Sequence, residues 1–240
     1  MPDPRNFRLR VTFCKQGRLA LLSHLEVARA LERAVRRAGL PFAVSEGFSP
    51  HMKIAFGAAL PVGVGGTREL FDLQMTRYVR PEEALAALQA ASVPDLMVKA
   101  CSYIDAHAPA ASAAYPVGTY RALLSCAPAA LPVPEEVRVV RKKKEKVLHV
   151  PEFLAGEMEL AGATLTLSLV SKPTGSLRPD VLLAACCAEA NAEAQPDGGS
   201  ENPLAFLVEN TDPTLIDADA CTERNPLRVL TITRIDQRPA

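Results

Sequence analysis

Alternation of apolar and polar residues at the start of the chain predicts a strand followed by a helix. In residues 7–13 every second side chain is apolar and arginine or threonine lies between, so we expect a strand with one face in water. Residues 24–38 then repeat apolar side chains at helical spacing. Ser23 and Glu26 form an S-x-x-E capping box at the start of this helix, and Gly39 with Pro41 ends it.

The first half of the chain continues in the order strand, helix, strand, strand, helix, strand. Residues 54–60 and 71–75 alternate as a strand pair around a glycine-rich turn. Residues 80–91 begin a second helix with Pro81 at its first position, and residues 95–103 form a fourth strand. This order is the β-α-β-β-α-β arrangement of ferredoxin-like domains.

The second half repeats the same order less clearly. We predict strands at residues 119–126, 146–150, 163–170 and 227–235, and helices at 134–141 and 178–190. The fold class we expect is therefore α+β, with two tandem ferredoxin-like domains. The N-terminal domain spans residues 1–105, an Ala/Pro-rich linker spans 106–118, and the C-terminal domain spans 119–240 with a mobile loop at 189–203.

Composition excludes several broad classes. Lys plus Arg and Asp plus Glu both total 27, so the net charge does not point to nucleic acid or a membrane. The six cysteines lack C-x-x-C spacing, so we expect no metal site and no cofactor, and we interpret them as buried thiols. No apolar run is long enough for export or for spanning a membrane, so we expect a reduced, cytoplasmic protein without a membrane partner.

The segment SEGFSPHMK, residues 45–53, carries more chemistry than a plain turn requires. Bent backbone amides, hydroxyl groups and cations together form concave surfaces that attract oxyanions. Residues 1–53 also contain ten basic side chains against four acidic ones, and the first strand presents two arginines on its polar face. We therefore predict an anion-binding or RNA-binding patch made of Arg8, Arg10, Ser45, Ser49 and Lys53.

Two histidines are candidate catalytic residues. His24 lies in the first turn of a helix, where the helix dipole favours a neutral imidazole. His51 lies in the 45–53 segment, and two histidines beside one phosphate suit acid–base attack by an RNA 2′-hydroxyl. The alternative for His24 is a helix-start residue that only bonds to backbone, and the sequence does not show whether the two side chains meet.

A dense basic run in the second half is a further nucleic-acid signal. Lys142, Lys143 and Lys144 lie within RVVRKKKEKV, where Glu145 is the single acidic residue. Lysines that neutralise phosphates release counterions and give salt-sensitive affinity. A solvated hairpin accounts for the same run equally well. Because aromatic residues make up 5% of the chain and Trp is absent, a sheet that stacks RNA bases is not expected.

A family resemblance adds a partner to these expectations. Residues 22–64, LSHLEVARALERAVRRAGLPFAVSEGFSPHMKIAFGAALPVGV, resemble a bacterial family of unknown function often labelled radical-SAM-linked proteins. Members of that family are stand-alone chains or C-terminal extensions of radical SAM, B12-binding proteins. The resemblance implies association with a radical SAM protein, which would supply the chemistry in trans because this chain lacks a C-x-x-x-C-x-x-C run.

Three functions from different classes therefore remain open. The first is an accessory protein that binds RNA or another phosphate-bearing substrate for a radical SAM partner. The second is a metal-independent endoribonuclease that uses His24 and His51. The third is a protein–protein adaptor whose open sheet faces dock a partner.

Overall fold

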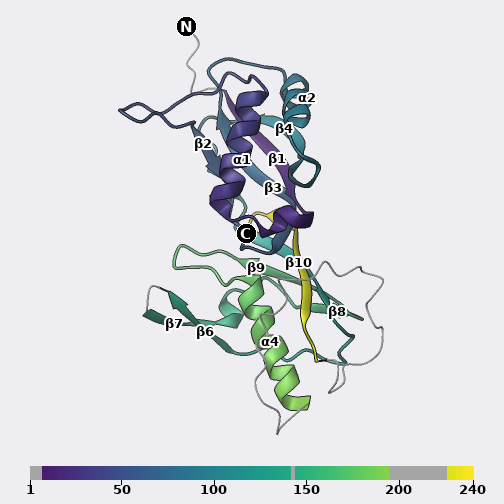
Figure 1. The fold of residues 1–240 in the computed structure, drawn as a ribbon. Coiled ribbons are helices and arrows are strands. Elements are labelled where there is room, and N and C mark those ends of the chain that lie inside the picture. Colours follow the sequence, from purple (N-terminus) through teal and green to yellow (C-terminus); the bar gives the residue numbers. More distant parts are fainter. Residues whose placement is uncertain (1–6, 142–143, 195–225) are drawn as a thin grey trace. The chain divides into compact units, whose positions relative to one another are not determined.

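A computed structural model describes residues 7–141, 144–194 and 226–240 of the chain (Figure 1). The chain forms two compact units. The first comprises Met1–Pro116 with Gln237–Pro239, and the second comprises Val117–Asp236 with Ala240. The described part of the chain contains four α-helices together with antiparallel strand pairs, so the protein is of the mixed α/β class.

The N-terminal unit contains a sheet in which all four strands are paired antiparallel, in the order β4-β1-β3-β2. The strands are β1 (Arg8–Lys15), β2 (Ile54–Phe56), β3 (Val64–Gln74) and β4 (Val98–Ile104). Two main helices, α1 (His24–Arg37) and α2 (Pro81–Ala91), connect them, with short 3-10 turns η2 (Gly17–Leu21) and η3 (Pro94–Leu96). The predicted order of six elements is confirmed in this unit.

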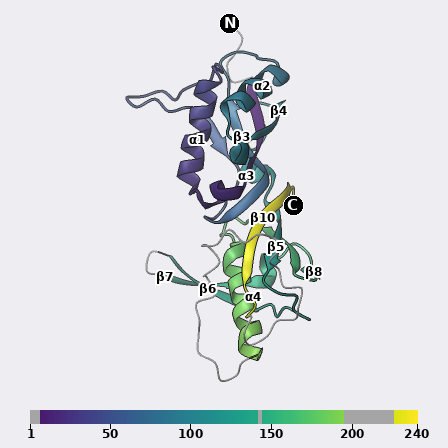
Figure 2. The ribbon, with the colours of Figure 1, turned by 45° about the vertical axis from the view of Figure 1, so that its right-hand side comes forward.

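Both helices pack on one face of this sheet, where the core lies (Figures 1 and 2). Leu9 and Val11 of β1 are fully buried against α1 residues such as Leu31 and Val35, and α2 adds Leu88. Each fully buried side chain of this size stabilises the fold by about 2 kcal/mol. The alternation read from residues 7–13 therefore separates a core face from a polar face.

The first helix begins and ends where the sequence predicts. The Ser23 hydroxyl accepts from the Glu26 amide at 3.4 Å, and the Glu26 carboxylate accepts from the Ser23 amide at 2.8 Å. The Ser23 hydroxyl also donates to the Glu26 carboxylate at 2.7 Å, and this bond, followed by the bond from the Ser23 amide, lowers the pKa of Glu26. At the other end of the helix, Gly39 has a backbone φ of 65°. Residues that carry a side chain rarely adopt this left-handed conformation, so glycine suits the position.

The segment predicted as a linker, residues 106–118, is partly helical. It contains α3 (Ala111–Ala114), in which Ala111 is fully buried. Residues up to Pro116 belong to the N-terminal unit, and Val117 begins the first strand of the next one.

The second unit contains the strand order β10-β5-β9-β8 and one long helix. Its elements are β5 (Val117–Leu124), η4 (Val150–Glu152), β8 (Glu159–Ala161), β9 (Thr164–Val170), α4 (Pro179–Ala194) and β10 (Val229–Arg238). Six residues of the predicted mobile loop, 189–194, lie in α4, and the rest of that loop lies outside the described residues.

The prediction of a helix at residues 134–141 is wrong. The segment forms β6 (Glu136–Arg141), which pairs antiparallel with β7 (Lys144–His149) as a separate two-stranded sheet. Val137 faces Leu148 across this pair, and both are 6% exposed. Three valines in four positions favour a strand because β-branched side chains lose rotamer freedom in a helix. With a hairpin in place of that helix, the tandem ferredoxin-like arrangement is not confirmed.

Replacing Ser23 with Ala tests the helix start. The variant should lose about 1 kcal/mol of unfolding free energy, because it removes the cap that accepts from Glu26. Urea unfolding followed by circular dichroism measures this loss. Ser49→Ala, at an exposed loop position, is the matched control and should unfold like the parent protein. Equal stability of the two variants would show that the capping box does not hold this helix.

Candidate functional site

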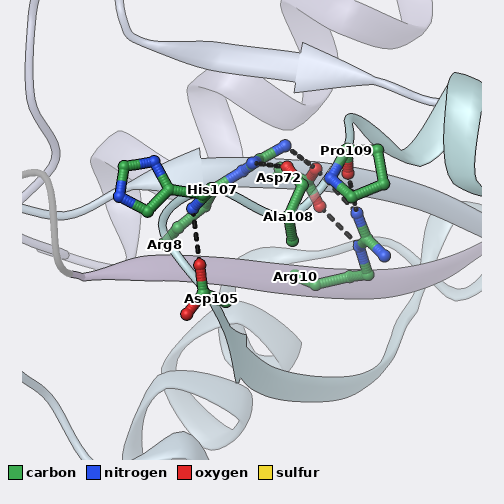
Figure 3. Close-up of polar contacts among 7 residues, drawn as sticks. All are labelled: Arg8, Arg10, Asp72, Asp105, His107, Ala108 and Pro109. Carbon is green, nitrogen blue, oxygen red and sulfur yellow. Dashed lines mark hydrogen bonds and ion pairs between the residues drawn. The ribbon is translucent and has the colours of Figure 1, made fainter.

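Arg8 and Arg10 surround a buried carboxylate on the polar face of β1 (Figure 3). Asp72 lies opposite Arg10 in the register of β1 with β3 and is 3% exposed. Arg8 Nη2 donates to Asp72 Oδ2 at 2.7 Å, and Arg10 Nε donates to Oδ1 at 2.7 Å. The Asp72 hydrogen bond raises the pKa of Arg10.

Backbone carbonyls from the segment after β4 complete this cluster (Figure 3). Arg8 Nη1 donates to the Ala108 carbonyl, and Arg10 Nη2 donates to the Pro109 carbonyl at 3.2 Å. The Arg10 guanidinium also lies over the Tyr115 ring, 5.4 Å from its centroid. Both guanidinium groups therefore bind groups of their own unit, and their predicted role in binding an external anion stays a prediction.

The predicted anion loop is a hairpin between α1 and β2, projecting beside α1 in Figure 1. The Ser45 amide donates to the His51 carbonyl at 2.7 Å, and the His51 amide donates to the Ser45 hydroxyl at 2.9 Å. The Ser45 side chain thus closes the loop. Ser49, His51 and Lys53 are exposed, and Phe48 is fully exposed. The loop holds these groups on its surface, and the hydrogen bonds between Ser45 and His51 stay within the loop.

His24 and His51 belong to different environments. His24 is the first residue of α1, and its ring meets Phe56 edge-on with centroids 5.4 Å apart. It lines a pocket whose walls include Phe56 and Leu60. His51 is part of the exposed hairpin and does not line that pocket. Among the described residues, no contact joins the two imidazoles.

The pocket beside His24 also contains two charged residues that sequence reasoning missed. Lys15 is 2% exposed and Glu69 is 5% exposed, and both line this pocket. The signal was present in the sequence, because Lys15 and Glu69 share the alternation of the core-facing residues Phe13 and Phe71. Charged residues at core-facing positions of a strand break the apolar pattern, and such breaks are expected at functional or strained sites.

The second predicted site lies on the β6–β7 hairpin. Lys142 and Lys143 lie outside the described residues, and Lys144 begins β7, paired with Arg141. Arg138 and Glu145 form an exposed ion pair at 3.5 Å. Lys146 Nζ donates to the Thr174 carbonyl at 2.9 Å. Of the basic run, Arg138 and Arg141 therefore belong to β6, and Lys144 and Lys146 belong to β7.

Three of the cysteines that the structure describes have thiols whose pKa is raised by burial. Burial raises the pKa of Cys101 and of Cys186 to about 12 and that of Cys187 to about 11, so these thiols stay protonated at neutral pH. Cys14 also has a free thiol, whereas Cys126 is disulfide-bonded, so the expectation of reduced cysteines fails at that position. Within the described ranges, no group of His, Cys, Asp and Glu could hold a metal ion. None of the helices described is long and apolar enough to cross a membrane.

Replacing Asp72 with Ala tests whether the arginine cluster holds the fold. The change leaves two poorly solvated guanidinium groups without their carboxylate, and we expect a loss of about 3 kcal/mol in unfolding free energy. Glu83→Ala breaks the solvent-exposed Arg80–Glu83 pair and should change the unfolding free energy far less, because water screens this pair. Chemical denaturation compares the variants, and similar losses would show that Asp72 does not anchor the arginines.

The comparisons with known proteins give a family without an activity. The family model described as "Uncharacterized protein conserved in bacteria (DUF2344)" matches residues 8–167, which is more than half of the chain. The match covers the whole pocket, the arginine cluster, the exposed hairpin and β6–β7. No curated protein matches the chain. The protein therefore belongs to the DUF2344 family of uncharacterised proteins conserved in bacteria.

Proposed function

We propose that this protein is an accessory RNA-binding protein and that the β6–β7 hairpin is its contact surface. The observation that carries this proposal is the two-stranded β6–β7 ribbon, drawn beside α4, whose sequence is rich in basic residues (Figures 1 and 2). Residues 136–149 contain six basic side chains against two acidic ones, whereas the whole chain is neutral. Such a local excess attracts phosphates even where the molecule as a whole does not.

The exposure of the hairpin supports this role. Arg138 and Glu145 have side chains 75% and 55% exposed, so their ion pair contributes little and can be exchanged for contact with a phosphate. Val140, 75% exposed, and Val147, 40% exposed, lie on the same face as that pair. Val137 and Leu148 pair near the start of β6 and the end of β7, and both are buried. A ribbon that is anchored by buried side chains and has a basic sequence suits contact with a nucleic-acid backbone.

We also propose that the protein works with a radical SAM protein. This part rests on the resemblance of residues 22–64 to radical-SAM-linked proteins. In this arrangement the chain holds the RNA and the partner performs the reaction. We further propose that both units are variants of the ferredoxin-like arrangement, because β10-β5-β9-β8 repeats the order β4-β1-β3-β2.

The other two candidate functions lack an observation in their favour. An endoribonuclease requires His24 and His51 at one phosphate, and these residues lie in different environments. An adaptor requires apolar residues on an open sheet face. In the N-terminal unit that face carries Arg8, Arg10 and Asp72.

Changing the basic run tests RNA binding. Replacing Lys142, Lys143 and Lys144 with Ala should lower the slope of log affinity against log salt by about 2 for single-stranded RNA, because three phosphate contacts are lost. Fluorescence anisotropy with labelled RNA at several salt concentrations measures the slope. The matched control removes three exposed arginines of α1, Arg29, Arg33 and Arg37, and should keep the parental slope. Absence of affinity at low salt, or equal slopes in both variants, would refute the proposal.

Purification of the untagged chain from its host tests the partner. We expect a radical SAM protein to co-elute and to be identified by mass spectrometry of the bound fraction. A chain that elutes alone, under conditions that preserve its RNA binding, would refute the proposed partner while leaving the RNA proposal standing.

A further inference from the structure

One large apolar side chain of the N-terminal unit is fully exposed. Phe48 lies in the hairpin between α1 and β2, residues 42–53, which we call the arm and which projects beside α1 (Figures 1 and 2). Every other phenylalanine that the structure describes is buried or half-buried. A single exposed apolar residue is common on protein surfaces, so the meaning of Phe48 depends on how the arm is built.

The base of the arm is anchored in the fold. The Ala43 amide donates to the Gln74 carbonyl of β3, and the Lys53 amide donates to the Ala43 carbonyl, both at 2.8 Å. Met52 is 6% exposed and belongs to the hydrophobic core, and Phe42 packs against that core. The arm therefore continues the hydrogen bonding of the sheet outward from a buried base.

The tip of the arm is closed without the help of Phe48. The backbone amide and the hydroxyl of Ser45 both form hydrogen bonds with the backbone of His51. Gly47 has a φ of 123° and makes the turn before Phe48, a conformation that favours glycine. Because the Phe48 ring is fully exposed, replacing it removes no contact that holds the arm.

Charge divides the arm into a tip and a basic rim. Residues 46–50, the tip, carry one carboxylate and no cation. Lys53 is exposed at the base, and the Arg36 guanidinium lies over the Phe42 ring, 5.2 Å from its centroid. Arg36 and Arg37 are the basic residues in the last turn of α1. The contact between Arg36 and Phe42 therefore brings the basic end of α1 to the base of the arm.

We propose that the arm docks a partner protein, with the Phe48 ring inserted in an apolar pocket of that protein and acidic side chains at the edge of the pocket. Aromatic side chains that fill such a pocket inside a polar rim carry most of the binding free energy at protein interfaces. Val44, 48% exposed, adds apolar surface to the arm. Residues 32–53 contain four basic side chains against two acidic ones, so an acidic rim complements them.

The charge at the tip favours a protein over a nucleic acid or a membrane. Glu46 lies two residues before Phe48, so a phosphate or an anionic lipid headgroup would meet a like charge beside the ring. Binding to nucleic acid depends on cations that neutralise phosphates at the point of contact. The tip has an apolar ring and a carboxylate there instead.

This inference names the surface that would hold the proposed radical SAM partner, and it rests on the proposed function for the identity of that partner. It does not involve the β6–β7 hairpin. Variants of the arm should therefore keep the parental affinity for RNA, and loss of partner binding can be told apart from loss of RNA binding.

Photocrosslinking of the full chain in its host tests which molecule contacts the tip. The photoreactive residue p-benzoylphenylalanine takes the place of Phe48, or, in a matched control, of Val93, which is 51% exposed after α2. We expect irradiation to join position 48, but not position 93, to one protein. Mass spectrometry should identify it as a radical SAM protein and place the link in a segment that contains acidic residues.

The protein identified in this way is then purified and titrated against variants of the chain by calorimetry. Phe48→Ser should weaken binding about tenfold or more, whereas Val93→Ser should bind like the parent. Lys53→Glu should weaken binding at low salt, and the difference should shrink as salt is added, because ions screen an exposed charge. Unfolding curves verify that all three variants fold.

Two results would overturn the proposal. The first is a position 48 that is joined to no protein, or to RNA, lipid or a second copy of this chain. The second is equal affinity of Phe48→Ser and the parent for the partner, which would leave the proposed radical SAM association standing. If the partner lost in Phe48→Ser is a protein of another class, the docking arm is supported and the radical SAM association is refuted.

Discussion

The two-residue period of β1 is the constraint on which the N-terminal unit depends. Leu9 and Val11 point into the core, so Arg8 and Arg10 must point to the opposite face. A shift of one residue would exchange these sets and bury two guanidinium groups in an apolar layer. Asp72 on the neighbouring strand fixes the same register from the polar side, because it sits opposite Arg10 and binds both arginines.

The end of β1 departs from this period and creates the pocket. The register with β3 shifts between Phe13 and Lys15, and Phe13, Cys14 and Lys15 are all buried. A bulge of this kind changes where a side chain points, and bulges are frequent beside functional sites. Here the shift ends an apolar strand with a buried ammonium group, close to a carboxylate that needs a glycine beneath it.

Sequence reasoning worked where local pattern and tertiary packing agree. The alternation in β1, the capping box at Ser23 and the glycine at position 39 all mark boundaries that the structure retains. It failed at residues 134–141, where Pro134 and two glutamates resemble a helix start but the valines that follow pair with β7. The partner strand supplies hydrogen bonds and a buried contact that outweigh a weak helix signal.

Part of the candidate sites could likewise be predicted from the sequence. Basic residues in RVVRKKKEKV and the exposed hairpin chemistry at residues 45–53 are local features. The role of Arg8 was not predictable in this way, because its carboxylate partner is 64 residues away along the chain. Lys15 and Glu69 could have been noticed from their core-facing positions in the alternation, but that they line one pocket depends on strand pairing.

The sequence by itself determined the elements of the N-terminal unit, their order and the face that each turns inward, because these follow from short-range periodicity, caps and turn residues. Only the tertiary structure decided which charges meet. Asp72 reaches Arg8 and Arg10, and His24 comes to the pocket of Lys15 and Glu69, through strand register and helix packing. Those contacts join residues far apart in the chain, and their energies depend on burial that no local pattern specifies.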